Sequence, residues 1–93
     1  MDTKKYIEAL DMVLSKRYES REYSLNGYKE EAVCLAYNNG WLVFNGERGN
    51  HYDEVKCDTI LKACMEFIRK MTHKTEDISI MENEFLVFFA KAA

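Results

Sequence analysis

The sequence of 93 residues predicts one α+β domain, residues 1–93, in which an antiparallel meander sheet of three to four strands is packed by an N-terminal helix and one or two C-terminal helices. Three observations predict this class. Apolar side chains recur at helical spacing in residues 3–18, and they do so again in residues 60–71. Between these segments, residues 32–57 alternate apolar and polar side chains in runs separated by turns rich in Asn and Gly.

The first helix is expected over residues 3–18, because its apolar side chains recur at every third or fourth position and therefore share one face. Asp2 or Thr3 can cap its first turn with a side-chain oxygen. The residues that form the apolar stripe are Tyr6, Ile7, Leu10, Val13, Leu14 and Tyr18.

Strands and tight turns are expected next. Residues 21–25 are a short strand candidate, and the Asn-Gly pair at residues 26–27 suits the positive φ angles of a tight turn, so we expect the chain to turn back there. Residues 32–37 alternate, and the Asn-Asn-Gly sequence at residues 38–40 connects them to a strand that opens on Trp41. One face of the strand would carry Val33, Leu35 and Tyr37, and the other Ala32, Cys34 and Ala36.

The third strand runs into a short charged tip, residues 47–50, which is the best candidate for a binding site in this chain. Gly46 and Gly49 free the backbone to turn, which presents Glu47 and Arg48 to solvent. Polar side chains on a loop held by two strands are suited to recognition. One alternative is an ordinary hairpin end, whose Glu47 and Arg48 only keep the strand edge soluble. A second alternative is a structural role, in which Arg48 bonds back to carbonyls or to Glu47.

After the tip, the chain is expected to return as an edge strand over residues 52–57, whose charged side chains protect the edge against aggregation. A helix follows that Asp58 or Thr59 can cap. Its apolar stripe must pack on the sheet and consists of Ile60, Leu61, Cys64, Phe67, Ile68 and Met71. The last segment is ambiguous, because helical spacing favours a helix capped by Thr75, whereas residues 84–90 also fit a buried strand.

Composition and net charge indicate the cellular compartment and the kind of binding partner. No apolar run is long enough to span a bilayer and no signal-peptide region follows Met1, so we expect a soluble cytoplasmic protein with no membrane partner. The net charge of −3 argues against direct binding of nucleic acid and favours a basic protein partner. Cys34, Cys57 and Cys64 sit in apolar patterns, and we expect them to be buried, reduced and without a metal.

Five segments form an ordered combination along the chain: Tyr23-Ser24-Leu25-Asn26-Gly27, residues 31–35, Gly40-Trp41 with Val43-Phe44, Glu47-Arg48-Gly49, and Ala63-Cys64 with Phe67. Together they resemble a family of small bacterial immunity proteins from polymorphic-toxin systems. The match covers roughly residues 20–71, so residues 72–93 are a C-terminal extension without a counterpart. Cys57 and Ile60-Leu61 depart from the family pattern, which has a larger apolar residue and acidic residues at these positions.

The resemblance implies a protein that binds a cognate toxin and neutralises it by covering its active site or substrate path. The net charge favours a basic toxin, such as a nuclease. Contact residues are expected at the tip and, as an electrostatic field, in the last segment: Glu47, Arg48, Tyr52, Asp53, Glu76, Asp77, Glu82 and Glu84. The alternative explanation for the four acidic residues of the last segment is that they form the solvated face of a helix and contact no partner.

A different class of function stays open, namely a self-associating adaptor module whose Phe-rich segment, residues 85–89, packs against a second copy. The chain is accordingly expected to be a monomer or a weak dimer.

Motifs for catalysis and for cofactors are missing from the sequence. It has no glycine-rich phosphate loop, no serine nucleophile motif and no dinucleotide fingerprint. His51 and His73 form no metal-ligand spacing with the cysteines. Glu47, His51 and Asp53 could do acid–base chemistry only beside a pocket, which nothing in the pattern supplies. We therefore expect no enzyme, no catalytic residue, no metal and no cofactor.

Overall fold

The computed structural model describes residues 3–72 and 75–91, and within these ranges it has three helices and four strands that confirm the α+β class. In chain order these elements are α1 (Thr3–Ser15), β1 (Tyr23–Ser24), β2 (Ala32–Tyr37), β3 (Trp41–Glu47), β4 (Asn50–Cys57), α2 (Ile60–Met71) and α3 (Thr75–Lys91). In this part of the chain, none of the helices has the length and apolar character needed to cross a membrane.

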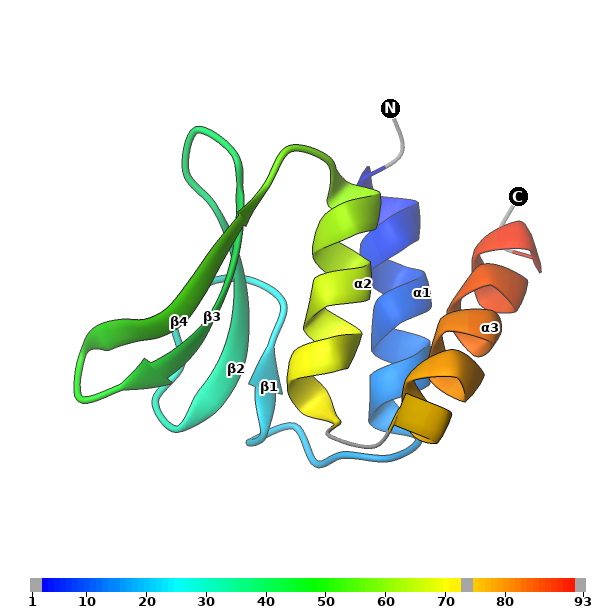
Figure 1. Cartoon of the computed structure of the whole chain (residues 1–93), viewed down its shortest axis with the longest axis horizontal. Coiled ribbons are helices and arrows are strands. Elements are labelled where there is room, and N and C mark those ends of the chain that lie inside the picture. Colours follow the sequence, from blue (N-terminus) through cyan, green and yellow to red (C-terminus); the bar gives the residue numbers. More distant parts are fainter. Residues whose placement is uncertain (1–2, 73–74, 92–93) are drawn as a thin grey trace.

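The helices lie together on one side of the sheet (Figure 1). α2 packs directly against β2, β3 and β4, and α1 lies beside α2. α3 packs on α1 and α2 on the side away from the sheet (Figure 1). The turn between β3 and β4 extends away from all three helices and is exposed.

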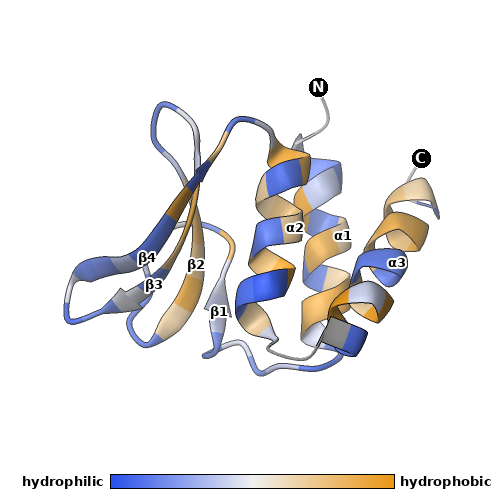
Figure 2. Ribbon diagram, viewed as in Figure 1, coloured by the Kyte–Doolittle hydropathy of each residue, from blue (hydrophilic) through white to orange (hydrophobic). Residues whose placement is uncertain are grey.

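The sheet has the strand order β1-β2-β3-β4. β2 and β3 form the expected antiparallel hairpin, in register over the whole of β2. β4 returns antiparallel to β3 as an edge strand, with a register shift between Val43 and Asn45. β4 is largely hydrophilic (Figure 2), which agrees with the expected charged edge.

The expected turn back at residues 26–27 is wrong, because β1 pairs with β2 in parallel. We call residues 25–31 the crossing segment. This segment runs over the face of the sheet that carries no helix. It returns the chain to the end of the sheet at which β1 begins, so that β2 runs parallel to β1. The Tyr28 ring stacks on Phe44 at a centroid distance of 6.5 Å, and the backbone of the segment contacts the Cys34 sulfur. These contacts replace the tight hairpin that the Asn-Gly pair suggested.

The helix ends differ slightly from expectation. α1 ends at Ser15, and Tyr18 instead packs on the core, where its hydroxyl donates to the Met71 carbonyl at 3.3 Å. Thr59 caps α2, since its Oγ1 accepts a hydrogen bond from a backbone N–H of the first turn at 3.1 Å. The last segment is helical, so the helix prediction is confirmed over the strand. Asp2, one of the two expected caps of α1, lies outside the described residues.

Two apolar clusters hold the layers together. The larger one lies between the sheet and the helices, and its fully buried members include Leu10, Leu14, Leu35, Val43, Phe67, Ile68, Met81 and Phe85. The smaller one, Ala32, Cys34 and Phe44, lies on the opposite face of β2 and β3. All three cysteines are buried and unbridged, and the expected burial is confirmed.

Candidate functional site

The candidate site is the tip, residues 47–50, where β3 turns into β4. Glu47 pairs with Asn50, which leaves Arg48 and Gly49 as a two-residue turn. Both have positive φ angles, 52° and 78°, as a type I′ hairpin turn requires. Arginine seldom adopts such an angle, so the surrounding fold holds Arg48 against its local preference.

Two side chains of the crossing segment fix the backbone of this turn, an arrangement that we call the tip clamp. The Glu30 carboxylate accepts a hydrogen bond from the Arg48 N–H at 2.8 Å. The Tyr28 hydroxyl accepts one from the Gly49 N–H at 2.7 Å and donates to Glu30. The hydrogen bond from Tyr28 lowers the pKa of Glu30, which keeps the carboxylate charged, and the same bond raises the pKa of Tyr28.

An aromatic stack supports the tip clamp. Phe44 is fully buried, and its ring stacks on His51 at a centroid distance of 3.7 Å. Tyr28 stacks on the same pair, 6.5 Å from Phe44 and 6.1 Å from His51. The Nδ1 atom of His51 lies 2.7 Å from Oε2 of Glu54, which fixes the imidazole ring. The stack therefore joins the crossing segment to β3 and β4 next to the turn.

The tip side chains that we expect to contact a partner lie at the surface. Glu47, Arg48, Tyr52 and Asp53 are all exposed, and the exposed fraction of Tyr52 is 46%. Asp53 accepts a hydrogen bond from Asn45 Nδ2 at 3.3 Å. The alternative in which the Arg48 side chain bonds back to the loop does not occur. The backbone N–H of Arg48 donates to Glu30, whereas the Arg48 guanidinium makes no hydrogen bond or ion pair with any residue of 3–72 or 75–91.

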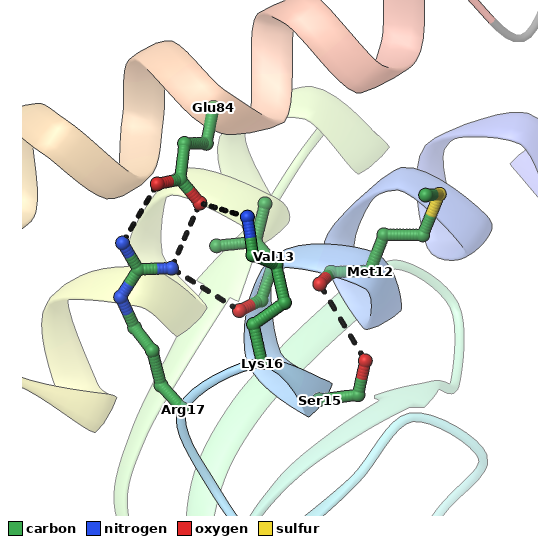
Figure 3. Close-up of polar contacts among 6 residues, drawn as sticks. All are labelled: Met12, Val13, Ser15, Lys16, Arg17 and Glu84. Atoms are coloured by element: carbon green, nitrogen blue, oxygen red, sulfur yellow. Dashed lines mark hydrogen bonds and ion pairs between the residues drawn. The ribbon is translucent and has the colours of Figure 1, made fainter.

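The acidic residues of α3 are not part of the tip, because α3 lies on the far side of the helical layer from the sheet (Figure 1). Glu76 is exposed, whereas Asp77 and Glu82 are partly buried. Glu84 is bound within the fold, where both of its oxygens accept hydrogen bonds from Arg17 at 2.8 Å (Figure 3). Its charge is therefore compensated internally, and the structure separates the expected contact residues into two distant groups.

A shallow hollow of about 490 Å³ adjoins the tip, between the sheet and the C-terminal end of α2. Three carboxylates line it, those of Glu22, Glu31 and Glu47. Lys70 is the one basic side chain among the described residues of the lining. The tip thus continues into a surface with an excess of negative charge, which is the sign that attracts a basic partner.

Within the described ranges, no three His, Cys, Asp or Glu residues lie close enough together to hold a metal ion. Burial raises the pKa of the Cys64 thiol to about 12 and also raises the pKa of Cys34 and Cys57, so these thiols are poor nucleophiles. His73 lies outside the described residues.

Sequence reasoning did not connect Tyr28 and Glu30 with the tip. They precede the backbone groups they bind by 21 and 18 positions, and no spacing rule links residues so far apart in irregular chain. Gly46 was the available signal, because glycine inside a strand often marks the close approach of another backbone. A Cβ atom at Gly46 would collide with the Lys29 carbonyl of the crossing segment.

The chain matches none of the family models, curated proteins or solved structures with which it was compared. The resemblance to immunity proteins therefore rests on the motif residues themselves. Two of those motifs are connected in the structure, since residues 23–27 lead into the crossing segment that clamps residues 47–49.

Proposed function

We propose that the protein is a non-catalytic binding partner that neutralises a cognate bacterial toxin, as immunity proteins do. The observation that carries the proposal is the tip clamp. Tyr28 and Glu30 bind only the backbone of the turn, so the side chains of Glu47 and Arg48 stay free for an external contact.

A turn that is fixed before binding loses little conformational freedom when a partner docks, which improves affinity. Arg48 supports this interpretation, because an arginine is held at a positive φ angle where glycine or asparagine would suit the turn better. An arginine in such a position is readily explained by a contact that needs its guanidinium. Inhibition would come from covering the toxin's active site or substrate path.

The partner that suits this surface is a basic protein, such as a nuclease toxin. The net charge is −3, and the hollow beside the tip carries Glu22, Glu31 and Glu47. Complementary charge accelerates association and excludes partners of the wrong sign. Tyr52 and Asp53 extend the same exposed strand edge and complete the proposed contact surface.

The test is co-expression of this chain with the protein encoded by its neighbouring gene in a bacterial host. We expect the neighbour's product to stop growth when expressed alone, and this chain to restore growth and to co-purify with it. Protection should require amounts of this chain equal to those of the toxin, because an inhibitor that binds stoichiometrically does not turn over. A harmless neighbour, or toxicity that persists in the presence of this chain, contradicts the proposal.

A second candidate function is self-association through α3, which is favoured by three apolar side chains about half exposed on that helix, Ile80, Leu86 and Val87. The Phe-rich segment is itself engaged within the fold, since Phe85 is buried and Phe89 stacks on Tyr6 at 4.3 Å. Sedimentation at two concentrations tests this candidate. A sedimentation coefficient independent of concentration excludes it, whereas a dimer that Val87→Glu dissociates supports it.

A further inference from the structure

A groove of about 1030 Å³ lies where β4 leads into α2, at the opposite end of β3 from the tip (Figure 1). The β2–β3 turn and the end of β4 form one wall of the groove, and one side of α2 forms the other. The lining combines apolar and basic side chains, among them Tyr37, Lys56, Leu61, Lys62, Met65 and Arg69. None of these residues belongs to the contact surface proposed above.

Apolar side chains form the floor of the groove. Leu61 and Met65 lie four positions apart on α2, so they follow one another along one side of the helix. The exposed fraction of Leu61 is 40%, and that of Tyr37 on the opposite wall is 66%. An edge-to-face contact with Trp41, with ring centroids 5.0 Å apart, holds the Tyr37 ring in place. A partner that covers this floor would remove from water an apolar surface that the fold itself leaves uncovered.

The charge of the groove is positive. Its described lining carries three basic side chains and two carboxylates, namely Lys56, Lys62 and Arg69 against Asp58 and Glu66. Both carboxylates are already paired, Asp58 with Lys62 at 3.1 Å and Glu66 with Arg69 at 3.7 Å. The Lys56 ammonium makes no ion pair or hydrogen bond with any residue of the described ranges, so the surplus of positive charge is located there.

The basic groups are placed on both walls. The methylene chain of Lys56 lies against the β2–β3 turn, since a Cβ atom added at Gly40 would come within 2.8 Å of Lys56 Cε. Lys62 and Arg69 face the groove from α2. Each of these two is paired with one carboxylate only, and ammonium and guanidinium groups have more N–H donors than one such pair uses. A carboxylate that enters the groove therefore finds donors on either side.

We propose that this groove binds an acidic segment of a protein partner, with an apolar side chain on the floor and carboxylates beside the three basic side chains. Charge complementarity selects this occupant, because a basic segment would meet the uncompensated charge of Lys56. Nucleic acid suits the groove less well, since phosphate binding needs several unpaired cations and the net charge of the chain is −3. The groove is opposite in sign to the hollow beside the tip, so this inference goes beyond the proposed function and does not depend on it.

The test is a titration of the isotope-labelled protein that follows the chemical shifts of its backbone amides. The probe is the blocked peptide acetyl-Glu-Glu-Leu-Glu-Glu-Leu-amide. One control peptide has glutamine in place of every glutamate, and the other has serine in place of every leucine. We expect saturable shifts at groove residues such as Leu61 and Met65, and binding of each control peptide that is weaker by about fivefold or more. Equal binding of either control, no saturable shift, or shifts confined to residues outside the groove overturns the proposal.

Variants locate the binding. Lys56→Gln and Leu61→Gln should each weaken binding of the acidic peptide by about threefold or more, since the first removes the unpaired charge and the second part of the floor. Lys91→Gln removes the same charge from an exposed position of α3 outside the groove, so it controls for the change in net charge and should have no effect. Unchanged binding in both groove variants, or an equal loss in Lys91→Gln, overturns the proposed location.

Two further measurements distinguish other occupants. A single-stranded oligothymidine that binds the groove more tightly than the acidic peptide would identify nucleic acid and overturn the proposal. Shifts of the same groove residues when the protein alone is concentrated would identify a second copy of the chain and overturn it as well. No toxin is present in these assays, so their outcome is separate from that of the growth rescue.

Discussion

The guanidinium of Arg17 holds the carboxylate of Glu84 through two parallel hydrogen bonds, each 2.8 Å long, across 67 positions of sequence (Figure 3). Arg17 follows α1 by two residues, so the pair ties the end of α1 to the middle of α3. Lys16 lies 3.9 Å from the same carboxylate. α3 lies outside the segment that resembles immunity proteins, and the pair adds to the burial of Met81 and Phe85 in holding this helix against the rest of the domain.

Replacing Glu84 with glutamine should lower the free energy of unfolding at pH 7 by about 1 kcal/mol, because a partly buried bidentate pair is stronger than an ordinary surface pair. The hydrogen bond from Arg17 lowers the pKa of Glu84 from its usual value of 4.5. The carboxylate therefore contributes stability above the usual pKa, and the contribution is lost as the pH falls through the lowered pKa. Urea denaturation at pH 7 and in steps down to about pH 2 measures this difference.

The matched control for this experiment is Glu82→Gln, on the same helix, since Glu82 has no ion pair with any described residue. It should leave stability nearly unchanged. A loss as large as that of Glu84→Gln, or a difference in Glu84→Gln that persists at the lowest pH, contradicts the account of the pair.

Local periodicity was sufficient to predict most elements but not the contacts that connect them. The β2–β3 hairpin is confirmed because it is specified within one short segment. The expected stripe of α2 is wrong at Leu61, which is 40% exposed, whereas Ala63 is buried on the face that packs on the sheet. The parallel pairing of β1 was not predictable, since it depends on Tyr28 packing on Phe44 from another part of the chain. α3 was ambiguous because apolar residues such as Leu86 lie on its exposed side and blur the helical period.

Replacing Gly46 with alanine should destabilise the fold by about 1–3 kcal/mol, because the added methyl group would collide with the Lys29 carbonyl, a backbone atom that cannot rotate away. Thermal or urea unfolding measures the loss. Gly49→Ala is not a suitable control, since Gly49 has a positive φ angle. Ala36→Ser, on the same face of the sheet but partly exposed, should change stability much less. Wild-type stability in Gly46→Ala would show that the crossing segment does not lie where the structure places it.

The three thiols should react slowly in the native protein, because only the thiolate is nucleophilic and burial raises the pKa of each, that of Cys64 to about 12. Cys57 should react first, since it retains 7% exposure whereas Cys34 and Cys64 have none. Labelling with an aromatic disulfide reagent, before and after unfolding without reductant, measures both rates. Cys57→Ala should remove the fastest native phase. Fewer than three reactive thiols after unfolding would reveal a disulfide and contradict the prediction of reduced cysteines.

Replacing Tyr28 with phenylalanine should loosen the tip without disturbing the core, because it removes the hydroxyl that binds the Gly49 N–H and Glu30 while leaving the ring on Phe44. Amide hydrogen exchange of Gly49 should accelerate, as should that of Arg48 to a smaller extent, since Glu30 still binds it. Exchange in α2 should be unchanged. Equal protection of the Gly49 amide in both proteins would mean that the Tyr28 hydroxyl does not hold the tip in solution, since the remaining acceptor is Glu30 at 3.4 Å.

Replacing Arg48 with asparagine separates the contribution of this residue to folding from its contribution to binding. Asn-Gly is the preferred pair of a type I′ turn and asparagine tolerates positive φ, so Arg48→Asn should raise the stability of the hairpin by about 0.5 kcal/mol. Affinity for the toxin should nevertheless fall by about tenfold or more, because the guanidinium is the group offered to the partner. Arg48→Lys, which keeps a positive charge but loses the planar fork, should lose less affinity than asparagine and gain no stability. Thermal unfolding and binding measured on the same preparations decide the matter: if Arg48→Asn is more stable and binds the toxin as well as the wild type, Arg48 is not part of the contact surface.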